Sequence, residues 1–261
     1  MLGSQRRSLI LTLVEESGAV RVAELVERLG VSDMTIRRDI ERLSADGLLE
    51  RVHGGALAIG ASPSAPTGEE PGFSAKSTLQ LAQKSVIAAA ARKHIAPGST
   101  IGISAGTTTF ELARLVRDTP DLTVVTNSVP VAQLLHESGA PGQTVVLTGG
   151  VRTPSDALVG PVAVGALRTL HVDLLFLGAH GIDARAGLTT PNLVEAETNR
   201  ARVAAARDVC VLVDSSKWGT VGLSTFAELA DVDVLITDSG LPPGARTALA
   251  DAVGSLEIVE A

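Results

Sequence analysis

Apolar residues recur at helical spacing three times within residues 1–57, and a glycine follows each run. The three segments read "QRRSLILTLVEES", "RVAELVERL" and "SDMTIRRDIERLSAD". Their expected inward positions are Leu9, Ile10, Leu13 and Val14; Val22, Leu25, Val26 and Leu29; and Ile36, Ile40 and Leu43. The pattern predicts three helices, with Ser32 as the N-cap of the third. A short strand pair in "LLERVHGGAL", turning on Gly54 and Gly55, is expected to follow.

A different pattern begins after residues 58–73, "AIGASPSAPTGEEPGF", which lack apolar periodicity and predict a flexible linker. Residues 74–261 alternate short β-branched apolar runs with helical stretches such as "TFELARLV" and "EAETNRARVAAAR". The strand-like runs are "STIGIS", "LTVVTN", "QTVVLTGG", "VDLLFLG", "DVCVLVD" and "VDVLITD". Apolar strands that alternate with helices predict an α/β domain with a mainly parallel, doubly wound sheet.

Only "GVS" separates the second and third predicted helices, and a short turn containing glycine is typical of a helix-turn-helix. The strand pair would then be a wing, so residues 1–57 are interpreted as a winged helix-turn-helix DNA-binding domain. On the third helix, Thr35, Arg38 and Arg42 share a solvent face. Arg37 would be partly neutralised by Asp33 at i, i+4 spacing.

Asp39 would flank the basic face and reduce its charge. The expected DNA contacts are Ser32, Thr35, Arg37, Arg38, Arg42, Arg51 and His53. The net charge is −7, and residues 1–57 carry eight Lys/Arg against nine Asp/Glu, so composition alone does not suggest DNA binding. A solvated, salt-bridged helix on a protein-binding module is therefore the alternative.

Other protein classes have little support in the sequence. No apolar run approaches the ~20 residues of a membrane span, and the amphipathic N-terminus carries Glu15 and Glu16, unlike a signal peptide. The lone Cys210 is expected to be a small buried residue. Five scattered histidines lack metal-ligand spacing, and nucleotide-binding glycine motifs are missing. We expect a cytoplasmic protein without membrane attachment, metal or cofactor.

Glycine and small hydroxyl residues follow the predicted strands, in "SAGTTT", "TNS", "TGG", "GAHGID" and "DSSKWG". Backbone N–H groups at a helix N-terminus, together with threonine hydroxyls, can surround a phosphate. Lys217 would add a cation, and Asn127 could both donate to and accept from sugar hydroxyls. Ligands of parallel sheets bind beyond the carboxyl ends of the strands, so these loops predict a site for a polyhydroxylated anion.

Gly102–Gly106 also matches the G-x-S-x-G pattern of a hydrolase, with Ser104 as the nucleophile. That chemistry needs an acid and then a histidine later in the chain. The pairs Asp156 with His171 and Asp173 with His180 satisfy only the order. His171 also opens its strand at the end away from the expected site, so a serine hydrolase is a weak alternative.

The segment "VSDMTIRRDIERLSADGLLERVHGGA" resembles the winged helix-turn-helix of the DeoR family of bacterial transcriptional regulators. The body resembles the sugar-phosphate sensor domain of that family through "SAGTTT", "VVTNS", "LTGG", "VDLLFLGAHGID", "GLTTPNLVEAE" and "VLVDSSKWG". The resemblance implies a repressor, less often an activator, of a carbohydrate-catabolism operon, with a phosphorylated sugar as effector. Its partners would be operator DNA and a second or further copies of the chain, as a homodimer or homotetramer.

The sensor fold of that family is related to ribose-5-phosphate isomerase, which makes a sugar-phosphate isomerase the other alternative. That enzyme needs carboxylates to move a proton. Here "LGAHGID" places His180 and Gly181 where two acids are expected, so we expect binding without turnover and no enzyme activity. Asn199 stands where lysine is usual in the family, and Gln83 and Lys76 are further departures; no role is carried over to these three. The expected effector contacts are Ser104, Gly106, Thr107, Thr108, Thr109, Asn127, Gly149, Gly150, His180, Glu195 and Lys217.

Overall fold

The computed structural model describes residues 3–17, 19–52, 55–57, 77 and 79–261. The chain divides into two compact units, Met1–Ala65 and Pro66–Ala261. We call them the head and the body. The division falls within the predicted linker, residues 58–73, which lies outside the described residues.

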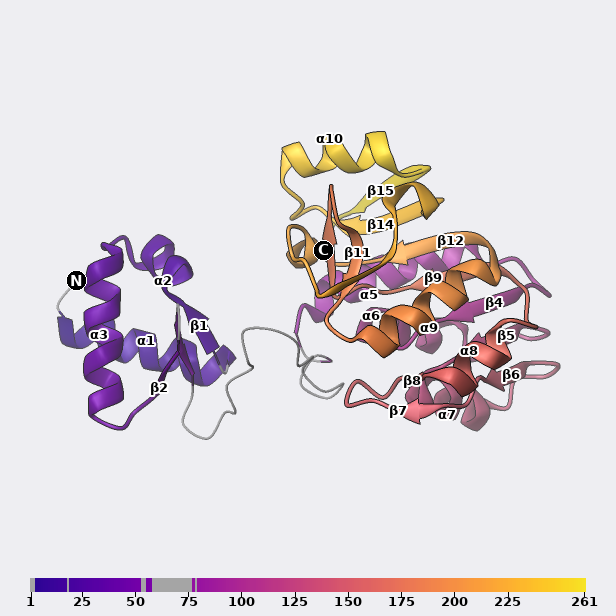
Figure 1. The fold of residues 1–261 in the computed structure, drawn as a ribbon, viewed down its shortest axis with the longest axis horizontal. Coiled ribbons are helices and arrows are strands. Elements are labelled where there is room, and N and C mark those ends of the chain that lie inside the picture. The colour runs from indigo at the N-terminus through magenta and orange to yellow at the C-terminus, as the bar shows by residue number, and fades with distance from the viewer. Residues whose placement is uncertain (1–2, 18, 53–54, 58–76, 78) are drawn as a thin grey trace. The chain divides into compact units, whose positions relative to one another are not determined.

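The head contains the three predicted helices and the predicted strand pair (Figure 1). Its elements are α1 (Gly3–Ser17), β1 (Ala19–Arg21), α2 (Val22–Leu29), α3 (Asp33–Ala45), β2 (Glu50–Val52) and β3 (Gly55–Leu57). The strands form one antiparallel sheet in the order β1-β3-β2. β1 was not predicted, because three residues are too few to show an alternating pattern and this strand exists only by pairing with β3.

The positions predicted to face inward on the three head helices meet in one core, except Leu9, which is 40% exposed. Ile10, Leu25, Ile36 and Ile40 are all buried there. Ser32 is the N-cap of α3, as predicted, because its Oγ accepts a hydrogen bond from the Thr35 backbone N–H at 3.4 Å. The direction in which α3 presents its polar side chains is therefore set by its packing.

Asp39 does not flank the basic face, and that expectation was wrong. Its side chain is on the inner side of α3, where it is only 5% exposed. Arg6 of α1 donates to it through Nε at 2.5 Å, and Arg7 lies 3.5 Å away. Asp39 therefore joins α3 to α1, and its charge is neutralised by Arg6 and Arg7 of α1 rather than by the exposed arginines of α3.

Replacing Asp39 with alanine is expected to lower the free energy of unfolding of the head by about 2–3 kcal/mol, because it leaves Arg6 partly buried without its partner. Denaturant titration of the full chain, followed by circular dichroism, measures this change. The control is Asp33→Ala, which removes an exposed pair with Arg37 and should cost less than about 1 kcal/mol. Equal losses in the two variants would contradict a structural role for Asp39.

The body is built on a seven-stranded sheet in which every neighbouring pair is parallel. Its order is β15-β14-β12-β9-β4-β5-β6. The strands are β4 (Thr100–Ile103), β5 (Thr123–Thr126), β6 (Thr144–Leu147), β9 (Val172–Leu177), β12 (Ala206–Leu212), β14 (Val234–Asp238) and β15 (Ser255–Val259). The six predicted strands are present, and β15 was missed because Glu257 interrupts its apolar run; an edge strand needs less apolar surface.

Helices cover both faces of this sheet, as the alternating pattern predicted. They are α5 (Leu81–Ala91), α6 (Thr107–Val116), α7 (Val129–Ser138), α8 (Pro161–Leu167), α9 (Leu193–Ala204) and α10 (Pro243–Ala252). Three short 3-10 turns are η1 (Arg92–His94), η2 (Ser215–Lys217) and η3 (Leu229–Asp231). A hairpin of β7 (Val151–Arg152) and β8 (Leu158–Val159) and an antiparallel sheet of β10 (Gly181–Asp183), β11 (Gly187–Thr190) and β13 (Ser224–Ala227) complete the body.

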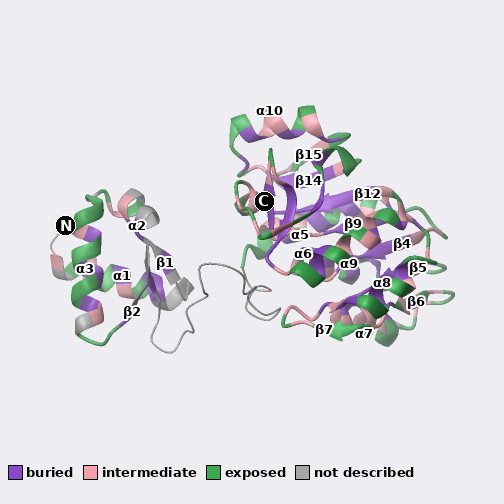
Figure 2. Cartoon of the chain, in the orientation of Figure 1, coloured by how far each residue is buried: buried purple, intermediate pink, exposed green. Residues whose placement is uncertain are grey.

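Alternation along the central strands gives the body two cores, one on each face of the sheet (Figure 2). In β9, Phe176 packs on one face with Leu112 of α6. Leu175 and Leu177 pack on the other face with the helices α8, α9 and α10. Successive strand residues point to opposite faces, so a strand buried on both sides needs the near-continuous apolar sequence seen here.

Cys210 is fully buried and free, as expected for a small apolar residue in β12. Burial, with a smaller contribution from the Glu257 charge, raises the pKa of its thiol well above its usual range. The thiolate is the reactive form. In the native protein at pH 8, Cys210 should therefore not react with Ellman's reagent, whereas one thiol per chain should react after unfolding in guanidinium. Rapid modification of the native protein would contradict this prediction.

The order of the strands locates the expected site. From β4 the sheet continues to β5 and β6 on one side, and to β9, β12, β14 and β15 on the other. The connections after β4 and β9 therefore leave the sheet in different directions, and ligands bind in the crevice that such a switch point opens.

In the described part of the chain, none of the helices has the length and apolar character needed to cross a membrane.

Candidate functional site

A pocket of about 240 Å³ lies at the carboxyl ends of the central strands, next to the β4–β9 switch point. The loops after β4, β5, β9 and β12 form its wall, together with the first turns of α5, α6 and α9. His171 and Asp173 instead line a hollow that Thr100 and Arg207 share, at the amino ends of the strands. His171 therefore lies at the opposite end of the sheet from Ser104.

The N-terminus of α6 opens into the pocket. Gly106 is its N-cap, with φ of 154°, and provides no side chain to cap the first turn. The first backbone N–H groups of a helix have no partner within the helix. The Thr107 and Thr108 hydroxyls also have no hydrogen bond to any residue that the structure describes. Backbone and side-chain donors thus converge where the helix dipole favours an anion.

The other hydroxyls of this motif stabilise the turn itself. The Thr109 hydroxyl donates to the Ser104 carbonyl oxygen at 2.7 Å and also lies 3.0 Å from the Gly106 carbonyl oxygen. Ser104 is 3% exposed, and its Oγ accepts a hydrogen bond from the Gly178 N–H at 3.1 Å. Ser104 is not among the residues that line the pocket; its hydroxyl connects the ends of β4 and β9.

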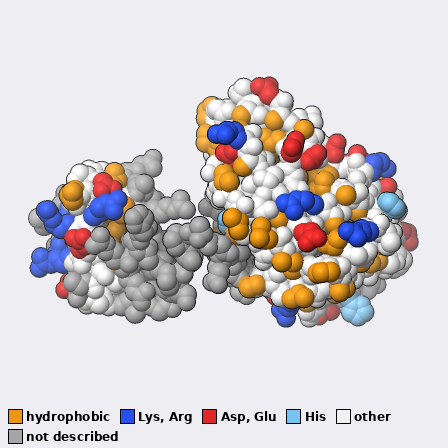
Figure 3. Space-filling model, viewed as in Figure 1, with side chains coloured by type: hydrophobic (Ala, Val, Ile, Leu, Met, Phe, Trp, Pro, Cys, Tyr) orange, Lys and Arg blue, Asp and Glu red, His pale blue; other side chains and the backbone are white. Residues whose placement is uncertain are grey.

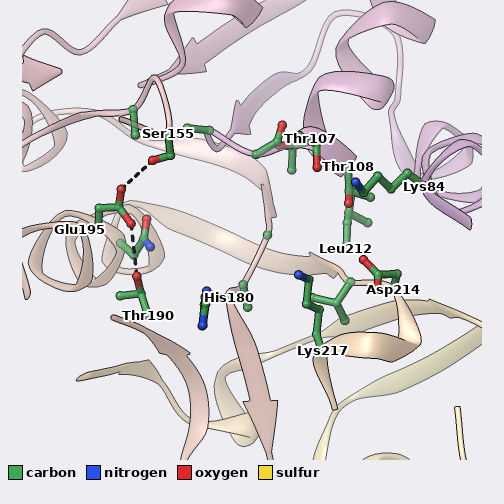
Figure 4. Close-up of a pocket in the computed structure, with 18 of the residues that line it drawn as sticks. Lys84, Thr107, Thr108, Ser155, His180, Thr190, Glu195, Leu212, Asp214 and Lys217 are labelled. Carbon is green, nitrogen blue, oxygen red and sulfur yellow. Dashed lines mark hydrogen bonds between the residues drawn. The ribbon is translucent and has the colours of Figure 1, made fainter. Parts of the chain in front are cut away.

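Two lysines lie on the same side of the pocket as these donors (Figure 4). Lys217 ends η2, and its ammonium has no hydrogen bond or ion pair with the described part of the chain. Lys84 of α5 is only 4% exposed and donates to the Leu79 carbonyl. Lys84 was not predicted from the sequence. Its spacing could have indicated it, because Ile87 and Ala88 follow it at i+3 and i+4 and are buried, which places Lys84 on the inward face of α5.

Asp214 also lines the pocket, together with both lysines. It caps η2, because its Oδ1 accepts from the Ser216 backbone N–H at 3.1 Å and also from the Ser216 hydroxyl. The carboxylate therefore holds the turn that presents Lys217. It was not predicted as a site residue, although the aspartate in "VDSSK" directly follows a buried strand and precedes a turn.

A carboxylate occupies the opposite side of the pocket. Glu195, in the first turn of α9, is 9% exposed. Its Oε1 accepts from the Ser155 hydroxyl at 2.8 Å, and its Oε2 accepts from the Thr190 hydroxyl at 3.2 Å. His180, from the loop after β9, projects into the space between Thr190 and Lys217. Ser155 and Thr190 were not predicted, because they become site residues only by holding Glu195.

Asn127 follows β5 and lines the pocket, but most of its amide is already used. Its Oδ1 accepts from the Ala105 N–H at 3.0 Å and from the Arg202 guanidinium, and its Nδ2 donates to the Leu158 carbonyl at 3.1 Å. Arg202 is 2% exposed, and burial lowers its pKa to about 9. Asn127 therefore connects the turn before α6 to α9, with a buried positive charge behind it.

Gly149 and Gly150 lie in the turn after β6 and do not line the pocket. A Cβ at Gly150 would lie 2.5 Å from the Val159 carbonyl oxygen. Glycine is needed there because the backbone of β8 passes so close. The motif "TGG" thus serves the β7–β8 hairpin, which in turn carries Ser155 to Glu195.

The exposed side of α3 carries both basic and acidic side chains, and Lys/Arg and Asp/Glu atoms are interspersed on the head in Figure 3. Arg38 and Arg42 are exposed one turn apart, without an ion pair to the residues that are described. Thr35 is partly exposed on the same face, with its Oγ1 2.8 Å from the Ser32 Oγ. The Arg37 Nε donates to Asp33 at 2.6 Å, which raises the pKa of Arg37 and confirms the predicted neutralisation.

The predicted contacts from the wing are not tested by the structure. Arg51 is in β2, but its side chain is not described, and His53 lies outside the described residues.

Comparison with known proteins accounts for both units. A family model described as the DeoR-like helix-turn-helix domain matches residues 6–61, and one described as the DeoR C terminal sensor domain matches residues 79–239. The chain is 39% identical to the HTH-type transcriptional regulator GlpR of Haloferax volcanii, over 94% of each chain. It is 34% identical to the lactose phosphotransferase system repressor of Streptococcus mutans, over 91% of this chain and 93% of that one.

Among solved structures, a D-ribose-5-phosphate isomerase in complex with phospho-erythronic acid matches 52% of each chain, at 20% identity and a TM-score of 0.39. The two family models match the head and the body in order, and the two relatives align over nearly the whole length. The chain therefore belongs to the DeoR family of transcriptional regulators.

Proposed function

We propose that this regulator represses a carbohydrate-catabolism operon and that a phosphorylated sugar, bound in the pocket of the body, controls its affinity for DNA. The observation that carries the proposal is the pocket itself. Helix N–H groups, free hydroxyls and two lysines gather on one side, and a carboxylate held by hydroxyls lies on the other. The relative from Streptococcus mutans, named for a lactose phosphotransferase system, supports a sugar-linked operon.

The phosphate binds at the N-terminus of α6. Thr107 and Thr108 offer hydroxyls and backbone N–H groups there, and Lys84 and Lys217 supply positive charge. Charge-assisted hydrogen bonds are roughly twice as strong as neutral ones. Gly106 and Thr109 contribute by shaping the turn, and Ser104 acts only by joining the ends of β4 and β9.

The sugar hydroxyls bind on the opposite side. Glu195 faces the sugar with both carboxylate oxygens oriented by the hydroxyls of Ser155 and Thr190. His180 contributes a ring nitrogen. Asn127 has one amide hydrogen left for a hydroxyl, since its other hydrogen-bonding groups bind the protein.

The protein binds its sugar phosphate without converting it. A hydrolase would need a free Ser104, but this hydroxyl is buried and accepts the Gly178 N–H. An isomerase needs a carboxylate that can take a proton from a sugar carbon. The described carboxylates that line the pocket are Asp214, which caps η2, and Glu195, which two hydroxyls hold. Conversion of ribose 5-phosphate to its ketose, if lost in Glu195→Gln, would reverse this interpretation.

On DNA, a homodimer or homotetramer places two α3 helices in successive major grooves of a repeated site. Arg38 and Arg42 reach base edges or phosphates, while Ser32, Thr35, Arg37, Arg51 and His53 contribute weaker contacts. Effector and DNA prefer different conformations of the chain, because a ligand that binds two states equally shifts no equilibrium.

Trp218 directly follows Lys217 and packs against the core beneath the pocket, so it reports on binding. Titration of the full chain with individual sugar phosphates should change its fluorescence in a saturable way for the true effector. The unphosphorylated sugar is the matched control and should give no change at the same concentration. The same effector must also alter the mobility shift of DNA from upstream of the regulated operon. A folded sample that responds to no compound of a broad panel would contradict the proposed sensor site.

A further inference from the structure

The helices α8 and α9 cover one face of the sheet, and their outer surface is rich in apolar side chains. α8, with the sequence "PVAVGAL", contains no polar side chain. It buries Ala163, Val164 and Leu167 against the core and still exposes Val162 to solvent. A surface helix normally carries polar residues on its solvent side, and a helix that is apolar all round is normally buried. The outer side of α8 is therefore expected to be covered by another surface.

The exposed apolar side chains continue from α8 onto its neighbours. Val162 of α8, Leu193 at the start of α9 and Leu223 before β13 are 66%, 60% and 73% exposed. The Gly160 N–H, at the start of α8, donates to the Thr198 hydroxyl of α9 at 3.1 Å, and α9 packs against β13. Figure 3 shows hydrophobic side chains gathered over this side of the body, with scattered charged groups among them. Exposed apolar patches of this kind mark interaction surfaces.

The outward stripe of α9 is symmetric about its middle. Leu193, Glu197, Arg200 and Ala204 are exposed at spacings of four, three and four residues, which places them on one face of the helix. An acid and a base lie at the centre of the stripe, and an apolar residue lies at each end. Neither charge has an ion pair with the part of the chain that the structure describes, although Arg200 donates to the Ser224 hydroxyl at 3.0 Å. Both charges are therefore available to a partner.

A two-fold axis through the middle of this stripe matches the stripe with itself. In an antiparallel pair of α9 helices, Glu197 of one copy lies opposite Arg200 of the second copy, and the axis generates the same contact again. Leu193 lies opposite Ala204, whose small side chain leaves room for it. A two-fold interface must be complementary to itself, and charge pairs between adjacent helices fix their orientation. This complementarity favours a second copy of the chain over an unrelated protein.

We infer that the outer surface of α8 and α9, with the adjoining segment at Leu223, is the surface through which two bodies pair about a two-fold axis. The inference rests on the homo-oligomer of the proposed function and locates one of its interfaces. α9 also carries Glu195, which lines the pocket from the buried side of the same helix. The interface and the effector site thus share one element, so a shift of α9 on effector binding acts directly on the second copy.

Sedimentation velocity of the full chain tests this surface. The wild-type protein should contain at least two copies at micromolar concentration. Val162→Glu combined with Leu193→Glu should halve its mass, because the pair would bury four carboxylates without partners. Both positions are exposed in the first turn of a helix, where glutamate is favourable for folding. Leu115→Glu is the matched control: it changes an exposed leucine of α6, on the other face of the sheet, and should leave the mass unchanged.

Charge reversal tests the two-fold pairing itself. Glu197→Arg or Arg200→Glu alone should weaken self-association by about tenfold or more, because each substitution brings like charges together twice across the axis. Combining the two reversals exchanges the partners and should restore association close to the wild-type value. Both positions are exposed, and circular dichroism checks that each variant is folded.

An unchanged mass in the folded double glutamate variant, or a combined reversal that associates no more tightly than the single ones, would overturn the inference. In either case the proposed function stands if the variants bind operator DNA and keep the Trp218 response to effector. A wild-type chain that is monomeric at every concentration, with and without DNA, would refute both this surface and the proposed homo-oligomer, but not the pocket.

Discussion

Replacing both Arg38 and Arg42 with alanine is expected to weaken binding to operator DNA by at least about 100-fold, because each contact of an arginine with a base costs about 1–3 kcal/mol when lost. The two side chains are exposed one turn apart on α3, and the described residues offer them no competing carboxylate. Fluorescence anisotropy with labelled upstream DNA, measured over a range of salt concentrations, gives both the affinity and the number of ionic contacts. The salt slope should fall by about one for each arginine that contacts a phosphate.

Arg37→Ala provides the matched control on the same helix. It removes the same kind of side chain, but Asp33 already neutralises the charge of Arg37. The effect of Arg37→Ala on affinity for operator DNA should therefore be much smaller than that of the double variant. Effector binding by the body should be unchanged in all these variants. DNA binding that survives in the double variant, or that depends more on Arg37, would remove this face of α3 from the interface.

Replacing Lys84 with methionine is expected to weaken effector binding by roughly 10- to 150-fold, the equivalent of about 1.5–3 kcal/mol for a hydrogen bond to a charged group. Methionine keeps the apolar stem that packs within α5 and removes only the ammonium. Repression should then persist at effector concentrations that release the wild-type protein from DNA. Trp218 fluorescence measures the first effect, and a mobility shift with added effector measures the second.

Lys93→Met is the control for this change, because Lys93 is exposed in η1 and lies outside the pocket. Lys217→Met tests the same phosphate site from η2, a different element, and guards against a folding defect specific to the buried Lys84. Wild-type effector affinity in both folded pocket variants would place the phosphate elsewhere.

Much of the fold could be predicted from periodicity. Ile36 and Ile40 recur at helical spacing, and Leu175, Phe176 and Leu177 alternate between two faces of a buried strand, so the local sequence already specified which element each forms. β15 escaped prediction because an edge strand next to solvent tolerates Glu257. Such a strand is specified by its pairing with the neighbouring strand β14 rather than by a pattern in its own sequence.

The sequence predicted where the site lies, but not which residues of each loop face the pocket and which stabilise the backbone. Residues of the loop "SAGTTT" line the pocket, as predicted. Of its four hydroxyl groups, only those of Thr107 and Thr108 have no hydrogen bond to a described residue. Thr109 and Ser104 hold the backbone instead. Lys84 comes from a helix that no motif marks, and Gly149 and Gly150 were included only because they follow a strand.

By itself, the sequence determined the two-unit organisation, the helix-turn-helix, the doubly wound sheet and the end of the sheet at which the pocket lies. These features depend on local spacing, which short-range sterics and burial enforce. Only the tertiary structure decided which polar groups are left to act, since a hydroxyl, amide or charge is free or used according to neighbours distant in the chain. The Asp39 carboxylate forms an ion pair with Arg6, and the Ser104 hydroxyl accepts a hydrogen bond from the Gly178 N–H. Lys84 and Glu195 line one pocket for the same reason: packing of α5 and α9 against the sheet places the first turn of each helix at the carboxyl ends of the strands.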